Sequence, residues 1–104
     1  RCKKNDARMY KIVWAAKAKN NLEHTLEYWL NRNKSNSYPK KIVNDVIAKE
    51  DLLLANPFFG EETNYKGIRR VLILRNFSLF YAIEENSKEI RMITFRDNRK
   101  NPKF

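Results

Sequence analysis

The C-terminal third of the chain alternates between apolar runs and very short polar breaks. The runs are rich in β-branched and aromatic residues, as strands are; they are Ile68 to Leu74, Phe77 to Ile83 and Ile90 to Phe95. The breaks are too short for a crossover helix, so the three strands should be antiparallel neighbours. The first break, Arg75-Asn76, fits a two-residue primed turn because asparagine tolerates positive φ.

Both faces of these strands carry apolar residues. In the last run, simple alternation places Ile90 and Met92 on one face, and Arg91, Ile93 and Phe95 on the other. A sheet of this kind needs helices to cover one face and leaves the other for a groove or a partner.

Upstream, the apolar residues recur at helical steps. The first set predicts an amphipathic helix from Ala16 to about Asn33; it comprises Ala18, Leu22, Leu26, Trp29 and Leu30. The second set predicts a helix that ends at Asn56-Pro57, since proline disfavours continuation; it comprises Ile42, Val43, Val46, Ile47, Leu53 and Leu54. The polar break between them, Lys34 to Ser37, indicates an antiparallel helical hairpin packed on the sheet.

The stretch from Met9 to Trp14 has strand composition and would supply a fourth strand. The fold class is therefore α+β, in the order β-α-α-β-β-β, with a mainly antiparallel four-stranded sheet covered on one face by the helical hairpin. We expect a single domain over residues 1–104, because two cores in this length would each be too small. Residues 1–8 are expected to be flexible, and Phe58 and Phe59 to be tucked under the connection from helices to sheet.

The chain has a formal charge of +10 over 104 residues. That charge predicts attraction to an acidic partner, which nucleic acid, an anionic membrane surface or an acidic protein could provide. The single cysteine, Cys2, excludes an internal disulfide and a thiolate zinc cluster, as expected for the cytoplasm. No apolar run approaches the ~20 residues that span a bilayer, so we expect no membrane partner.

No catalytic motif stands out. The chain has two glycines and therefore no phosphate-binding glycine loop. Its one histidine, His24, is interpreted as a helix-surface or semi-buried residue without a catalytic role. We expect no metal, no cofactor and no small-molecule substrate. Tyr65 and Tyr81 are interpreted as packing residues.

Basic residues near the strand ends are the remaining candidates. Guanidinium groups bind phosphate oxygens and stabilise charge on a scissile phosphate. The candidate catalytic residues are Arg69, Arg70, Arg96, Asp97 and Arg99. Two alternatives stay open: a solvated cationic surface for the arginines, and for Asp97 an ion-pair role in place of proton acceptor.

Several short motifs, in this order and spacing, resemble the RelE/ParE toxins of bacterial type II toxin-antitoxin modules. They are Asn56-Pro57-Phe58-Phe59-Gly60, Ile68-Arg69-Arg70, Phe80-Tyr81-Ala82-Ile83, Glu89-Ile90, and the closing Arg96-Asp97-Asn98-Arg99-Lys100-Asn101-Pro102. The resemblance extends from Tyr10 to the C-terminus. The family's compact sheet with a helical hairpin agrees with the fold predicted above.

The resemblance implies one of two activities. RelE-like toxins are ribosome-dependent endoribonucleases that use basic residues and a histidine or tyrosine near the last strand, whereas ParE-like toxins poison DNA gyrase. Here that strand ends Phe95-Arg96-Asp97, so the general acid of an RNase is missing at the obvious place. Arg69 or Arg70 matches the family's strand arginine and Arg96 or Arg99 its terminal basic residue, while Asp97 matches an aspartate of some RNase members. We favour a ParE-like toxin without nuclease activity.

The resemblance also implies an acidic antitoxin whose segment wraps the toxin and folds as it binds. A charge of +10 would give such a partner both steering and specificity. A third hypothesis, from another class, is a non-toxic RNA-binding module.

Overall fold

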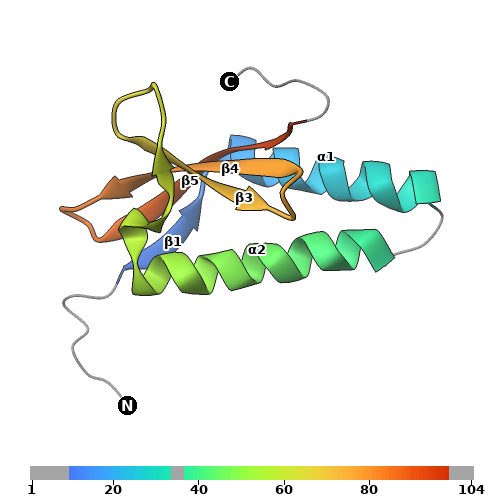
Figure 1. The fold of residues 1–104 in the computed structure, drawn as a ribbon, viewed down its shortest axis with the longest axis horizontal. Helices are drawn as coiled ribbons and strands as arrows, with labels where there is room; N and C mark the ends of the chain where they lie inside the picture. Colours follow the sequence, from blue (N-terminus) through green and yellow to red (C-terminus); the bar gives the residue numbers. More distant parts are fainter. Residues whose placement is uncertain (1–9, 34–36, 99–104) are drawn as a thin grey trace, which may run out of the picture.

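The computed structural model describes residues 10–33 and 37–98, so the predictions for residues 1–8 and for Arg99 lie outside the described residues. Two helices pack on one face of a five-stranded sheet in the order β1-β5-β4-β3-β2 (Figure 1). The elements are β1 (Lys11–Trp14), α1 (Ala16–Asn33), α2 (Ser37–Ala55), the 3-10 turn η2 (Pro57–Phe59), β2 (Glu61–Glu62), β3 (Ile68–Ile73), β4 (Phe77–Glu84) and β5 (Glu89–Asp97). The predicted α+β class is confirmed, with β1 parallel to β5 and the other pairs antiparallel.

The core lies between the helices and one face of the sheet. Its sheet side consists of Val71, Ile73, Phe77, Leu79, Tyr81, Ile90, Met92 and Phe95, and its helix side of Ala18, Ile42, Val46 and Leu53. The rings of Phe77 and Phe95 stack with centroids 5.3 Å apart. Burial of these apolar side chains is the main stabilising contribution to the fold.

A β-bulge in β5 changes which side chains face the helices. Phe80 pairs with Thr94, but the next residue, Tyr81, pairs with Met92, so Ile93 is an extra residue. An extra residue reverses the alternation beyond it. Phe95 therefore joins the core face, and its predicted place opposite Ile90 and Met92 is wrong.

The hairpin between β3 and β4 turns one residue earlier than predicted. Leu74 and Arg75 have φ of 52° and 66°, and the amide of Asn76 donates to the carbonyl of Ile73. Positive φ at both central positions defines a primed turn. The Leu74 amide donates to the Asp45 carboxylate of α2 at 2.8 Å, which helps hold a conformation that leucine rarely adopts.

The connection from α2 to β3 contains two elements that the sequence pattern did not reveal. The Asn56 side chain accepts from the Phe58 amide and begins η2, and β2 then pairs with Arg69 and Arg70. Phe58 and Phe59 are about half exposed, so the expectation that they are tucked under the connection is wrong. A two-residue strand gives no periodic signal, which explains why it was missed.

Candidate functional site

Arg69 lies on the helix-covered face and ties η2 to the sheet. Its guanidinium donates to the carbonyl oxygens of Gly60 at 2.6 Å and Phe58 at 3.3 Å, and pairs with Glu62 at 3.3 Å. It also lies 5.1 Å from the centroid of the Phe58 ring. With a side chain only 21% exposed, Arg69 is committed to these contacts.

Tyr81 of β4 also contacts the η2 segment, through its side-chain hydroxyl. Its hydroxyl accepts from the Gly60 amide and donates to the Pro57 carbonyl, both at 2.8 Å. Burial raises the pKa of the Tyr81 phenol, so the proton stays on the oxygen. The interpretation of Tyr81 as a packing residue is confirmed, whereas Tyr65 is about half exposed.

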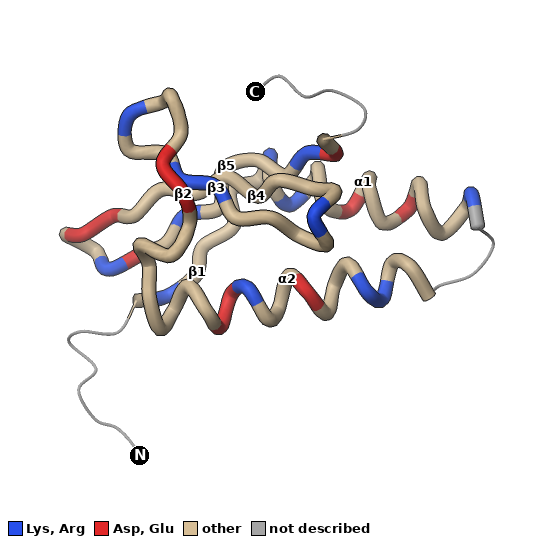
Figure 2. The backbone as a smooth tube through the Cα atoms, in the orientation of Figure 1, with Lys and Arg blue, Asp and Glu red and all other residues tan. Residues whose placement is uncertain are grey.

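Arg70 points to the opposite, helix-free face and is paired with Glu61 of β2. Figure 2 shows the acidic β2 directly beside the basic start of β3. The two glutamates were not anticipated as partners, although Glu61-Glu62 precedes Arg69-Arg70 closely enough for a hairpin. The cationic start of β3 is therefore partly neutralised.

Arg96 shares the helix-free face with Arg70. The register places Arg70 in a row with Phe80 and Thr94, and Arg96 in the next row with Ser78. One row along the strands and two strands across corresponds to roughly 12 Å between the two Cα atoms. Both guanidinium groups could therefore reach phosphates of one nucleic-acid strand, though not one oxygen without rearrangement.

Asp97 lies at the end of β5, on the other face from Arg96, opposite Phe77. Asp97 and Arg69 share the helix-covered face but lie near opposite ends of it, since their partners on β4 are Phe77 and Tyr81. The four described candidates thus do not form one cluster, although Arg70 of β3 and Arg96 of β5 share a face in neighbouring rows, and Arg99 lies outside the described residues.

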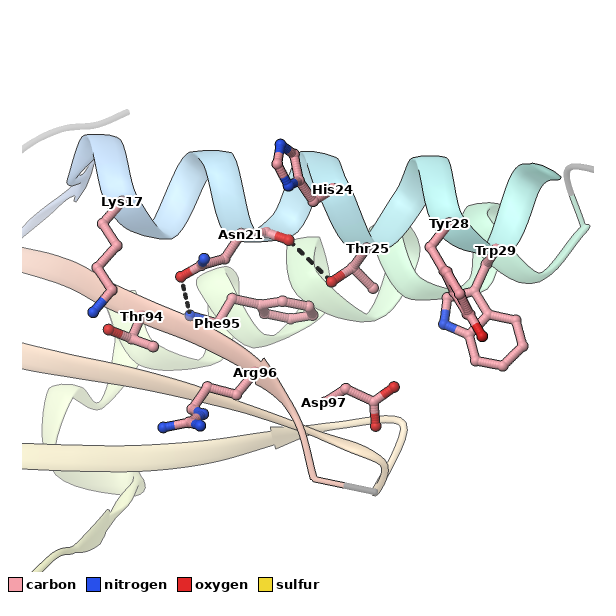
Figure 3. A pocket seen from close by; sticks show the side chains of 10 residues that line it. All are labelled: Lys17, Asn21, His24, Thr25, Tyr28, Trp29, Thr94, Phe95, Arg96 and Asp97. Carbon is pink, nitrogen blue, oxygen red and sulfur yellow. Dashed lines mark hydrogen bonds between the residues drawn. The ribbon is translucent and has the colours of Figure 1, made fainter. Parts of the chain in front are cut away.

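A groove of about 430 Å³ separates α1 from the end of β5 (Figure 3). Its walls are Lys17, Asn21, His24, Thr25, Tyr28 and Trp29 from the helix and Thr94, Phe95, Arg96 and Asp97 from the strand. In Figure 3, Lys17 extends from α1 toward Thr94, whereas His24 lies on the outer side of the helix. The helix side of this groove was missed, because a polar stripe beside an apolar one looks like ordinary solvated surface in sequence.

The groove offers groups for anion binding, beside the imidazole of His24 and the carboxylate of Asp97. The groove gathers a lysine, an arginine and several hydroxyl and amide groups, which contact phosphates in many complexes.

Within residues 10–33 and 37–98, no group of three or more histidine, cysteine or carboxylate side chains could hold a metal ion. In the same ranges, no helix is both long and apolar enough to cross a bilayer.

A family model described as the ParE toxin of type II toxin-antitoxin system, parDE, matches residues 12–102. This match covers most of the chain, so the protein belongs to the ParE toxin family of type II toxin-antitoxin systems. The resemblance inferred from the sequence motifs is thereby confirmed. No curated protein matches the chain.

Solved structures with the same fold include proteins of ParDE and RelBE toxin-antitoxin systems. A chromosomal ParDE system from P. aeruginosa is 21% identical, with a TM-score of 0.69 over 88% of this chain and 97% of that chain. The RelBE2 toxin-antitoxin complex of Mycobacterium tuberculosis is 16% identical, with a TM-score of 0.63 over 86% and 98%. A mutant of the E. coli toxin RelE in the free state is 10% identical, with a TM-score of 0.64 over 90% and 88%. At these identities the likeness establishes the fold.

Proposed function

We propose that this ParE-family protein is a cytoplasmic growth inhibitor directed at DNA gyrase, without nuclease activity, and neutralised by an acidic antitoxin. The observation that carries the proposal is the engagement of the strand arginines. Arg69 is bound to two carbonyls and Glu62, and Arg70 to Glu61. A metal-independent RNase needs unengaged cations around the scissile phosphate and a group that protonates the leaving oxygen.

The tyrosine nearest these arginines does not fill that role. The Tyr81 hydroxyl is held between the Gly60 amide and the Pro57 carbonyl beneath the sheet. That hydroxyl is therefore not placed to donate a proton to a substrate on the helix-free face, which supports a mechanism without RNA cleavage. His24 belongs to α1 and lines the α1–β5 groove, with its ring toward the outer side of that helix (Figure 3).

The apolar groove between α1 and α2 suits the antitoxin. It measures about 540 Å³, and its apolar walls are Leu26, Leu30, Pro39 and Val43. Leu30 is 45% exposed, so a partner could bury it. An antitoxin segment that folds on binding would bury such side chains to offset its ordering cost.

The test combines growth with two biochemical readouts. Expression alone should arrest growth, and the purified protein should inhibit supercoiling by gyrase while leaving translated messages intact. Arrest with message cleavage and full gyrase activity would reject the gyrase target. Normal growth with well-folded protein would reject toxicity and favour the RNA-binding module.

The RelE-like RNase remains the second candidate because Arg70 and Arg96 share one face in neighbouring rows. It predicts that Arg70→Ala and Arg96→Ala each abolish cleavage of translated messages. Arg75→Ala is the matched control, since Arg75 is an exposed arginine in the β3–β4 turn. An unchanged cleavage pattern in both active-face variants would reject this alternative.

A further inference from the structure

Helix α1 separates its charges between two grooves. Its glutamates, Glu23 and Glu27, line the groove toward α2. The groove toward β5 instead receives a stripe at steps of three and four residues, which form one face of a helix: Lys17, Asn21, His24, Thr25 and Tyr28. On the helix side of the α1–β5 groove, every side chain with hydrogen-bonding capacity is neutral or basic.

The strand side of this groove is an edge without a strand partner in the described part of the chain. Strand β1 pairs with β5 only from Glu89 to Met92. Beyond that point the Phe95 amide donates to the Asn21 side chain across a long 3.4 Å. Asn21 of α1 thus meets the strand edge here, and Arg96 lines the groove beside the largely buried Thr94.

An aromatic ring lies at the far end of the same stripe. Tyr28 is 38% exposed, and its ring contacts Trp29 edge-on at 5.2 Å between centroids. The Arg32 guanidinium lies 5.9 Å from the Tyr28 ring centre. A held, half-exposed aromatic ring beside cations is the usual platform on which single-stranded bases stack.

The length and the lining of the α1–β5 groove indicate which class of anionic ligand fits it. Tyr28 follows Lys17 by eleven residues of α1, which corresponds to roughly 16 Å along the helix axis. That length exceeds a mononucleotide. The groove offers cations and hydrogen-bonding groups but few exposed apolar anchors, whereas an acidic peptide that folds on binding needs apolar burial to offset its ordering cost.

We propose that the α1–β5 groove binds the sugar–phosphate backbone of single-stranded nucleic acid, with Lys17 and Arg96 at phosphates and Tyr28 stacking on a base. The proposal goes beyond the gyrase-directed function and does not depend on it. Asp97 also lines the groove, and its negative charge limits how many phosphates can enter.

The test compares Lys17 of α1 with Lys40 of α2. Binding of a short fluorescent oligothymidylate or oligouridylate is followed by anisotropy over a salt series. Lys17→Ala should weaken binding about fivefold near 0.1 M salt and reduce the log–log salt slope by about 0.7, as expected for one lost phosphate contact on a single strand. Lys40→Ala removes the same charge from the other groove and should leave affinity and slope close to wild type.

A second pair of variants tests stacking. Tyr28→Ala should weaken binding by about tenfold, in the range measured for loss of one base–aromatic stack, while Tyr28→Phe should bind like wild type. Circular dichroism melting of each variant shows whether it is folded. If Tyr28→Ala is unfolded, Lys17→Ala still tests the proposal, because Lys17 is exposed.

Three outcomes would overturn the proposal. They are no oligonucleotide binding by the wild type, equal losses for Lys17→Ala and Lys40→Ala, and a Lys17-dependent affinity for poly-glutamate in place of oligonucleotide. The last would assign the groove to an acidic protein segment. Gyrase inhibition, measured with the same variants, reports separately on the proposed function, so either proposal can fail alone.

Discussion

Two arginine neighbourhoods of the sheet differ in what surrounds them. At the start of β3, Arg69 binds backbone carbonyls and Glu62, and Arg70 is paired with Glu61. At the end of β5, the Arg96 side chain forms no ion pair or hydrogen bond within residues 10–33 and 37–98, and it borders a groove. The first neighbourhood stabilises the junction with η2, and the second leaves a guanidinium available to a ligand.

This difference shows that an arginine's role depends on the acceptors that the fold brings to it. Carbonyls near a half-buried guanidinium turn it into a structural connector, because hydrogen bonds to a charged group contribute more than neutral ones. An arginine at a sheet edge without such acceptors keeps its binding capacity. The following predictions test that contrast, from the largest expected effect to the smallest.

Gly60→Ala should have the largest effect, because the added Cβ would lie 2.5 Å from the Tyr81 hydroxyl oxygen and 2.8 Å from the Arg70 carbonyl oxygen. Overpacking of this kind costs about 3 kcal/mol. Urea unfolding monitored by circular dichroism measures it. Gly67→Ala is the control: no atom lies within 4 Å, and only its φ of +82° adds strain, about 1 kcal/mol. Equal losses in the two variants would contradict the close packing at Gly60.

Arg69→Met should lower the free energy of unfolding by about 2 kcal/mol, since it removes charge-assisted hydrogen bonds to two carbonyls while keeping an unbranched side chain. Arg96→Met should change it by less than about 0.5 kcal/mol, as surface substitutions do. Chemical denaturation of both variants gives the comparison. Similar losses would mean that the two arginines are alike in structural role.

Tyr81→Phe should cost about 1 kcal/mol near neutral pH through the lost hydrogen bonds. Burial raises the pKa of the Tyr81 phenol in the folded protein above its ordinary value of about 10. The folded state therefore favours the protonated form, and this share of stability, complete below the unfolded pKa, is lost as the pH rises through the folded pKa. Thermal melts between neutral and strongly alkaline pH should show a steeper decline for wild type than for Tyr81→Phe.

Glu61→Gln should change stability least, by no more than about 0.5 kcal/mol, because its pair with Arg70 is exposed and screened by water. Asp51→Gln, an exposed acid of α2, is the charge-matched control. A large loss of stability in Glu61→Gln alone would show that the Arg70 pair, too, is structural.

Long periodic segments could be predicted from the sequence. The start of α1 at Ala16 and the end of α2 at Ala55 were predicted within a few residues. Each helix repeats its apolar face over several turns, and Asn56-Pro57 ends the second. The order and direction of the three C-terminal strands followed from the shortness of their connections. The family followed from the order of elements and from motifs between Asn56 and Pro102, each of which is weak alone.

Features set by a single residue or by tertiary contact could not be predicted. The primed turn falls at Leu74 and Arg75, against the preference of leucine for negative φ, because contacts such as the Asp45 bond hold it there. The carbonyl acceptors of Arg69 lie on a short turn that has no periodic signature. The α1–β5 groove needs a polar stripe of one element to meet the edge of another, and sequence spacing does not show which elements become neighbours.

The extra residue at Ile93 affects how β5 is aligned with the last strand of related chains. Beyond the bulge, odd-numbered positions of β5 point where even-numbered ones pointed before it. A related chain of the same length without the bulge would present its basic side chain to the helices and its aromatic one to the helix-free face, whereas a chain that lacks only the extra residue would keep both on the faces they have here. Comparisons of the last strand should therefore be aligned by pairing partner on β4, because counting residues across an unmatched bulge assigns each position to the opposite face.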